Sequence, residues 1–220
     1  MKIEEIREIL KNTEESCLRE RLQDFSSDER DGVKKLVLQY GKKADRYEKE
    51  LIRLEKMRAY EKKYQETEYI CGIDEVGRGP LAGPVVTCAV ILPKDCRIPY
   101  INDSKKLTAA KREELYDIIM EQAEATGLGT IGPDRIDEIN ILQATYEAMR
   151  EAISKLEPAP DILLNDAVTI PEVTIPQVPI IKGDAKSVSI GAASIIAKVT
   201  RDRLMVEYDQ ILPEYGFASN

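Results

Sequence analysis

Residues 73–84 read IDEVGRGPLAGP, a stretch in which an apolar strand ends in two adjacent carboxylates before a turn of glycines and prolines. Side chains alternate along a strand, so Asp74 faces away from Ile73, and Glu75 falls where the strand opens out. Two carboxylates beside a glycine loop suit a hard divalent cation and a phosphate better than a packed interior. The stretch therefore indicates a functional site at the end of a strand.

The composition indicates a soluble globular protein without histidine chemistry. The 220 residues have a formal net charge of −8, and 43% of them are hydrophobic, enough for one core and a small second module. We expect a cytoplasmic location, since no run approaches the ~20 apolar residues of a membrane span and the acidic start is unlike a signal peptide. The four cysteines lack CxxC spacing, which favours buried free thiols. Because histidine is absent, metal or acid/base chemistry must use carboxylates and lysines.

Residues 1–66 are expected to form an N-terminal helical module. Apolar residues recur at spacings of three and four from Val33 to Leu54, the pattern of a helix with one buried face. We expect this helix to dock on its own module, rather than to form a coiled-coil dimer, in a monomeric protein. Residues 33–63 contain eleven Lys or Arg and five Asp or Glu residues. Either plain solvation or contact with a nucleic acid explains this basic segment.

Residues 67–220 alternate strands with helices, which indicates an α/β domain. The apolar run at 85–92 predicts a central strand, and the short turn before it predicts antiparallel pairing with the first strand. Residues 161–166 predict a short buried strand, and three prolines then limit the chain to a loop and an edge strand through Ile181. Helices are predicted from Thr108 to about residue 125, around 142–156 and over 188–208.

Two more carboxylates, Asp166 and Asp184, follow predicted strands. Functional groups of an α/β sheet gather where strands end, so these two acids can meet the pair at the end of the first strand. Four close carboxylates repel one another unless cations neutralise them, and oxygen ligands select Mg²⁺ or Mn²⁺. Two such ions ~4 Å apart would clamp a phosphodiester. Asp166 and Asp184 also have plainer interpretations: Asp184 caps the last helix, and Asp166 ends a strand.

Two further segments could contact a phosphate. Ser104, Lys105 and Lys106 offer a hydroxyl and two ammonium groups, although they also resemble an ordinary capped turn. The glycines that flank Arg78 let backbone amides approach a ligand closely, and Arg78 either pairs with a phosphate or fixes the loop. The spacing matches neither a Walker loop nor a GxGxxG dinucleotide site.

Five motifs occur in order between residues 69 and 217: IDEVGRGPLAGP at 73–84, NDSKKL at 102–107, INIL at 139–142, KGDAKS at 182–187 and AASIIAKVTRDR at 192–203. Together they resemble the motifs of bacterial ribonuclease HII. The resemblance implies a ribonuclease H-like fold, with a central mixed five-stranded sheet flanked by helices. It also implies an endonuclease that hydrolyses the RNA strand of RNA/DNA hybrids and nicks duplex DNA at embedded ribonucleotides, using Mg²⁺ or Mn²⁺ and leaving 5′-phosphate ends.

The resemblance assigns a role to each candidate residue. The metal-binding and catalytic positions fall on four acids: Asp74, Glu75, Asp166 and Asp184. The positions that read the ribose 2′-hydroxyl fall on the glycine loop: Gly77, Arg78 and Gly79. A phosphate-contacting segment matches Ser104, Lys105 and Lys106. Arg78 and Pro80 favour type HII over ribonuclease HIII, and the N-terminal extension resembles a module that assists substrate binding in Firmicute-type members.

Two departures from the family pattern bear on these expectations. Asn165 stands where the family has an apolar residue. The family also continues beyond Phe217 into a Lys-Gly-Tyr-Gly-Thr segment, whose tyrosine stacks on the substrate, whereas this sequence stops at Asn220. We therefore expect a C-terminally truncated chain. The alternative function is a hybrid-binding fragment that does not cleave, and a more distant one is a small-molecule phosphohydrolase.

Overall fold

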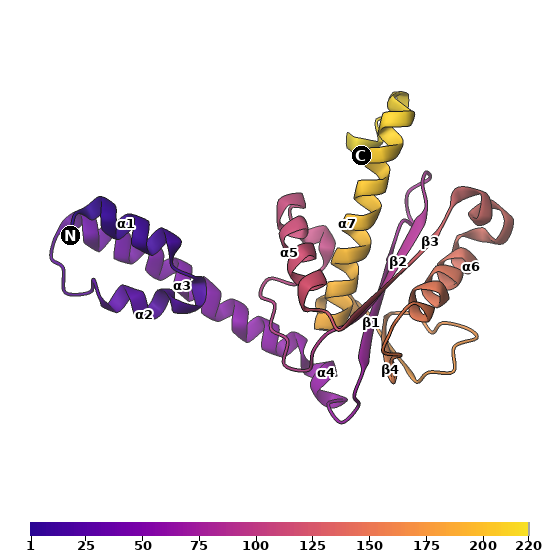
Figure 1. The fold of residues 1–220 in the computed structure, drawn as a ribbon, viewed down its shortest axis with the longest axis horizontal. Helices are drawn as coiled ribbons and strands as arrows, with labels where there is room; N and C mark the ends of the chain where they lie inside the picture. The colour runs from indigo at the N-terminus through magenta and orange to yellow at the C-terminus, as the bar shows by residue number, and fades with distance from the viewer. Residues whose placement is uncertain (220) are drawn as a thin grey trace. The chain divides into compact units, whose positions relative to one another are not determined.

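The computed structural model describes residues 1–219 and divides into two compact units, Met1–Glu55 and Lys56–Asn220 (Figure 1). The sequence predicts a junction after residue 66, but the short helix α4 (Ala59–Lys63) already belongs to the second unit. The reason is packing, since Tyr60 and Tyr64 beside this helix lie against the buried cluster of Ile70, Ile162, Leu164, Ile180 and Ile190.

The N-terminal unit is helical, as predicted. It contains α1 (Ile3–Asn12), α2 (Leu18–Gln23) and most of the long α3 (Asp31–Met57). Its core consists of aliphatic side chains from all three helices: Ile6, Leu10, Leu18, Leu22, Val33, Leu36 and Ala44. Arg19 of α2 also pairs with Asp45 and Glu48 of α3. This unit therefore has its own small core.

The second unit is built on the mixed five-stranded sheet that the resemblance implies. Its strands are β1 (Ile70–Val76), β2 (Val85–Ile91), β3 (Ala125–Ile131), β4 (Ile162–Asp166) and β5 (Gln177–Ile180). They lie in the order β3-β2-β1-β4-β5. β1 pairs antiparallel with β2, as predicted, and β2 pairs antiparallel with β3. β4 runs parallel to both β1 and β5, so the carboxyl ends of these three strands share one edge of the sheet.

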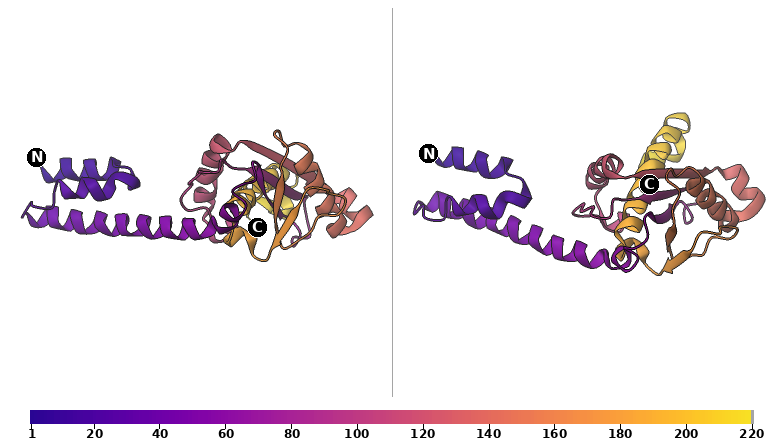
Figure 2. Two further views of the ribbon diagram at one scale, coloured as in Figure 1. Left: turned by 90° about the horizontal axis from the view of Figure 1, so that it is seen from below. Right: turned by 60° about the horizontal axis from the view of Figure 1, so that its bottom comes forward.

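Helices cover both faces of the sheet (Figures 1 and 2). The long helices are α5 (Ala109–Gln122), α6 (Pro133–Ser154) and α7 (Val188–Ile211). Cys71 of β1 faces the α6 side, where it packs near Met149. Gly72 faces the opposite side, against the first turn of α7. This alternation is the one predicted for the strand. Within residues 1–219, no helix is both long and apolar enough to cross a membrane.

The cysteines are free thiols, as predicted from their spacing. Cys71, Cys88 and Cys96 are buried, whereas Cys17 of the N-terminal unit is exposed. Burial raises the pKa of Cys71 and of Cys88 well above the ordinary value of a thiol, so both side chains stay neutral. They act as small apolar groups in the sheet.

Asn165, the polar residue in buried β4, is fully enclosed. Its side-chain amide donates to the Gln177 side-chain oxygen at 2.8 Å and to the Val168 carbonyl at 3.2 Å. Gln177 in turn bonds both backbone groups of Ile170. Asn165 keeps its place in the sheet register opposite Ile73 of β1, and its amide nitrogen is satisfied by Gln177 of β5 and by the loop after β4.

Gly129→Ala should destabilise the second unit by about 1–3 kcal/mol, because a Cβ there would lie 1.9 Å from the Ala148 carbonyl oxygen of α6. Urea denaturation measures this change in unfolding free energy. The matched control is Gly132→Ala, where a Cβ meets nothing within 4 Å. Equal stability of the two variants would contradict the close approach of α6 to β3.

Candidate active site

Parallel pairing brings two acids to one sheet edge. The register pairs Ile73 of β1 with Asn165 of β4, so the residues that follow, Asp74 and Asp166, are neighbours where the pairing of these two strands ends. Asp74 is only 7% exposed. Burial raises the pKa of Asp74 well above its usual range, the charges of Glu75 and Asp166 add to the effect, and a hydrogen bond from Ser194 partly offsets it. The surroundings of Asp74 therefore destabilise its charged form when no cation is bound.

Glu75 is the second acid of β1, and only one of its two carboxylate oxygens has a hydrogen-bond partner. Its Oε1 accepts a hydrogen bond from Arg78 Nη1 at 3.0 Å. Its Oε2 is buried and has no hydrogen-bond partner. Burial raises the pKa of Glu75, and the pairing with Arg78 opposes that rise. A buried carboxylate oxygen without a donor costs free energy, which a bound cation would recover.

Asp184 reaches the same neighbourhood from the short helix η3 (Gly183–Ala185), between β5 and α7. The Gly183 amide donates to Asp166 Oδ1 at 2.8 Å, which ties η3 to the end of β4. Burial raises the pKa of Asp184, and the charges of Asp103 and Asp166 raise it further. The four acids named from the sequence are therefore near enough for their charges to interact.

These acids do not already form a metal cage. Among residues 1–219, no group of three or more Asp, Glu, Cys or His side chains lies in metal-holding geometry. Two of the carboxylates are turned toward protein donors instead, Asp166 toward the Gly183 amide and Glu75 toward Arg78. The chemistry of the set still fits a hard divalent cation, because the ligands are carboxylate oxygens and one of them is buried without a partner.

The glycine loop after β1 is anchored by α7. Gly77 has φ of +102°, a conformation that favours glycine, and a Cβ there would lie 2.4 Å from the Pro84 carbonyl oxygen. Arg201 of α7, 6% exposed, donates from Nε to Pro84 at 3.0 Å and from Nη2 to Ala82 at 2.8 Å. A Cβ at Gly79 would meet nothing within 4 Å, so a ligand can approach the backbone there.

The second candidate loop is the short helix η2 (Ser104–Lys106), and its side chains point in different directions. Ser104 is 4% exposed, and its hydroxyl is hydrogen-bonded to the Ser194 hydroxyl at 2.9 Å. Lys105 and Lys106 are exposed, with Lys106 Nζ 3.6 Å from Asp103 Oδ2. The two ammonium groups are thus available to a ligand, whereas the Ser104 hydroxyl lies inside the protein.

Sequence reasoning missed the side chains that hold these loops. Ser194 hydrogen-bonds both Asp74 and Ser104, and so connects the first acid to η2. Arg112 of α5 donates to the carbonyls of Ser104 and Leu107. Ser194 and Arg201 stand seven residues apart on one face of α7, and the signal that could have found them is two polar residues at helical spacing in line with the apolar positions of the helix.

Asp74→Asn should stabilise the metal-free protein near neutral pH. The raised pKa of Asp74 means that the folded protein holds this proton more tightly than the unfolded chain does. Ionised Asp74 therefore lowers stability progressively as the pH rises above the ordinary Asp pKa of about 4. Chemical denaturation with a chelator present should show a larger unfolding free energy for the variant at pH 7, and a smaller difference near pH 4. A variant less stable than the wild type at pH 7 would contradict the electrostatic account.

Comparison with known proteins identifies the family. The Ribonuclease HII profile matches residues 71–220, and the Ribonuclease HII N-terminal domain profile matches residues 2–65. The Ribonuclease HII of Lachnoclostridium phytofermentans is 66% identical over 196 residues, which are 89% of this chain and 77% of that protein.

Solved structures agree. The ribonuclease H2 of Pyrococcus horikoshii OT3 matches with a TM-score of 0.59 and 29% identity over 65% of this chain and 76% of that one. Bst-RNase HIII in complex with Mn²⁺ shares the fold, with a TM-score of 0.54 and 19% identity over 67% of this chain and 56% of that one. The chain therefore belongs to the ribonuclease HII family of endoribonucleases.

Proposed function

We propose that this chain hydrolyses the RNA strand of RNA/DNA hybrids and nicks duplex DNA at embedded ribonucleotides. The observation that carries the proposal is the convergence of four acids at one sheet edge, beside a glycine loop with an approachable backbone. Family membership supplies the reaction class, and the acids supply ligands for the ions that such a reaction requires.

Two divalent ions, Mg²⁺ or Mn²⁺, are proposed to bind through Asp74, Glu75, Asp166 and Asp184. When bound, the ions activate a water and neutralise charge at the leaving oxygen, which yields 3′-hydroxyl and 5′-phosphate ends. The protein contributes position and charge, not a covalent nucleophile. Support comes from the buried Glu75 Oε2 without a donor and from the raised pKa values of Asp74 and Asp184.

Substrate recognition is proposed to use both loops. The backbone at Gly77, Arg78 and Gly79 would contact the ribose 2′-hydroxyl, the group that separates RNA from DNA. Lys105 and Lys106 would contact phosphates, since both are exposed. Ser104 belongs to the same segment, and through its bond to Ser194 it would hold the loop that carries the two lysines.

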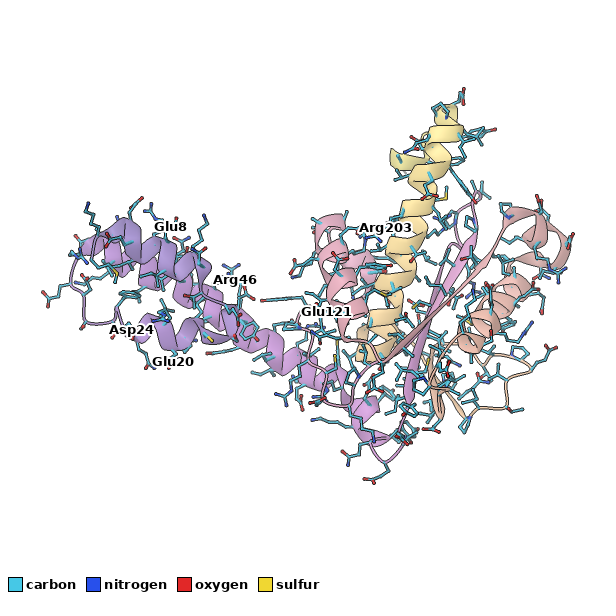
Figure 3. The ribbon with its side chains drawn as sticks, viewed as in Figure 1. Glu8, Glu20, Asp24, Arg46, Glu121 and Arg203 are labelled. Atoms are coloured by element: carbon cyan, nitrogen blue, oxygen red, sulfur yellow. The ribbon has the colours of Figure 1, made fainter. Side chains whose placement is uncertain are left out.

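The N-terminal unit is proposed to assist binding of the nucleic acid. Exposed basic side chains run along its part of α3: Lys34, Lys35, Lys42, Arg46 and Lys49 (Figure 3 labels Arg46). Their positive charge suits phosphate contacts in a chain that is acidic overall. We place the protein in the cytoplasm as a monomer, since its buried free thiols suit a reducing compartment and α3 packs within its own unit.

Asp74→Asn should lower cleavage of a duplex DNA containing one ribonucleotide by more than about 100-fold, because it removes a carboxylate from the reacting centre. Gel analysis of end-labelled substrate with Mg²⁺ or Mn²⁺ measures this loss. The matched control is Asp137→Asn, an exposed acid of α6 whose loss should leave the rate unchanged. Full activity of Asp74→Asn would refute the assignment. Hybrid binding by the wild type without any cleavage would favour the alternative, a binding fragment.

Replacing Lys34, Lys35 and Lys42 together by alanine should weaken hybrid binding and flatten its salt dependence. Each lost phosphate contact should reduce the slope of log affinity against log salt concentration by roughly one unit. Fluorescence anisotropy at several salt concentrations measures this slope. Lys11→Ala, an exposed lysine outside the basic segment, is the control. An unchanged slope in the triple variant would show that the basic segment is only solvated.

A further inference from the structure

The N-terminal end of α7 is held by a side chain from α4. Glu61 Oε1 accepts a hydrogen bond from the Ser187 hydroxyl at 2.5 Å and another from the Ser189 amide at 3.1 Å. The first amides of a helix have no partner within the helix and carry partial positive charge. A carboxylate at this position therefore both satisfies a free donor and interacts favourably with the helix dipole.

The same helix end carries the loop that bears Asp184. The amides of Lys186 and Ser187 donate to the Gly183 carbonyl at 2.9 and 2.8 Å. The Ser187 hydroxyl, while donating to Glu61, accepts from the Ile190 amide at 3.2 Å. A continuous series of hydrogen bonds thus runs from Glu61 through Ser187 and Gly183 to Asp166. Asp184 lies in the chain segment between Gly183 and Ser187, which this series holds at both ends.

Close packing makes this helix end sensitive to displacement. A Cβ at Gly72 of β1 would lie 2.1 Å from the Ser189 carbonyl carbon, and one at Gly183 would lie 2.6 Å from Ile190 Cδ1. The first turn of α7 therefore touches β1 on one side and the η3 loop on the other. No empty space separates this turn from its neighbours, so a shift of the turn would also move the η3 loop.

The residues around Glu61 are themselves held by packing and by a hydrogen bond. Tyr60 and Tyr64 pack against the buried cluster beneath β1 and β4, and Arg58, 8% exposed, donates to the Lys94 carbonyl at 2.5 Å. Beside Glu61 is a cavity of about 350 Å³, which Glu66 also lines. The second oxygen of Glu61, Oε2, is buried without a hydrogen-bond partner, so the carboxylate holds α7 through Oε1 alone.

We infer that Glu61 is a positioning residue for the active site, which sets the place of Asp184 through the N-terminal end of α7. The inference rests on the proposed metal-binding role of Asp184. Residue 61 lies within the range of the N-terminal family profile, residues 2–65, yet its contacts are made inside the second unit. The segment before β1 therefore has a task in catalysis that is separate from nucleic-acid binding.

The test compares Glu61→Ala, Glu61→Gln and the control Glu66→Ala in the full chain. Glu66 is exposed and lines the same cavity, so its loss should change nothing. In Glu61→Ala, hydrogen exchange at the Ser189 amide should accelerate on the order of tenfold because this amide loses its acceptor, and exchange at the Ile190 amide should also rise because its cap, Ser187, loses the partner that holds it. Calorimetry should show Mn²⁺ affinity weakened on the order of tenfold, since a second layer that orients a metal ligand is removed.

The kinetic readouts separate positioning from other roles. On a duplex with one ribonucleotide, Glu61→Ala should lower kcat while leaving KM unchanged, because the substrate contacts are intact. Glu61→Gln keeps an acceptor oxygen at the same place and should recover most of the Mn²⁺ affinity and of kcat. The double variant Glu61→Ala/Ser187→Ala should lose less than the sum of the two single variants, since the hydrogen bond between Glu61 and Ser187 is already missing in each of them.

Three results would overturn the inference. One is a Glu61→Ala protein that is less stable but keeps wild-type Mn²⁺ affinity and kcat, as expected of a purely structural residue. Another is a rise in KM alone, which would assign Glu61 to substrate binding. The third is unchanged amide exchange at Ser189. Failure of the proposed function would look different, because the wild type itself would then not cleave, while the exchange and Mn²⁺ measurements would still decide the role of Glu61.

Discussion

Repulsion among carboxylates that are held together at one buried sheet edge is the constraint on which the rest of this structure depends. The parallel pairing of β1 with β4 places Asp74 beside Asp166, and removal from water makes the charged form of Asp74 unfavourable. The protein tolerates this because other groups compensate in part: Ser194 bonds Asp74, Arg78 pairs with Glu75, and the Gly183 amide bonds Asp166. The arrangement thus gathers carboxylates in one neighbourhood at a free-energy cost that a divalent cation would relieve.

Helix α7 is the element that turns this sheet edge into a site. Its first turn lies against Gly72 and the η3 loop, its middle presents Ser194 to Asp74, and Arg201 holds the glycine loop through two carbonyls. Arg203, two residues beyond Arg201 and labelled in Figure 3, pairs with Glu113 of α5. Each loop with a proposed role in metal or substrate binding is therefore fixed to the same helix. Glu61 in turn holds the N-terminal end of this helix through Ser187 and Ser189.

The sequence predicted most of this fold, and it named the four acids that the structure brings into one neighbourhood, for identifiable reasons. Continuous apolar runs predicted β2 and β4, and carboxylates after predicted strands indicated the candidate active site. The residue pattern did not reveal β3, because Gly127 and Gly129 interrupt its apolar alternation; both glycines are needed where α6 approaches the strand. The packing of α4 with the second unit could not be predicted from the sequence, since the aromatic contacts of Tyr60 and Tyr64 with a cluster from distant segments leave no local signal. Hydrogen bonds between distant segments, such as that of Ser194 with Ser104, likewise have no local pattern.

Burial raises the pKa values of Asp74, Glu75 and Asp184 in the metal-free protein, and a bound divalent cation should lower them, so proton release on metal binding tests the electrostatics of this site. Titration calorimetry of Mn²⁺ into the full chain, repeated near pH 6.5 in buffers of different ionisation enthalpy, measures the number of protons released. The account predicts saturable binding with a net release of protons, because the pKa values of Asp74, Glu75 and Asp184 are all raised in the metal-free protein. Saturable binding with no dependence on the buffer, or no binding at all, would contradict it.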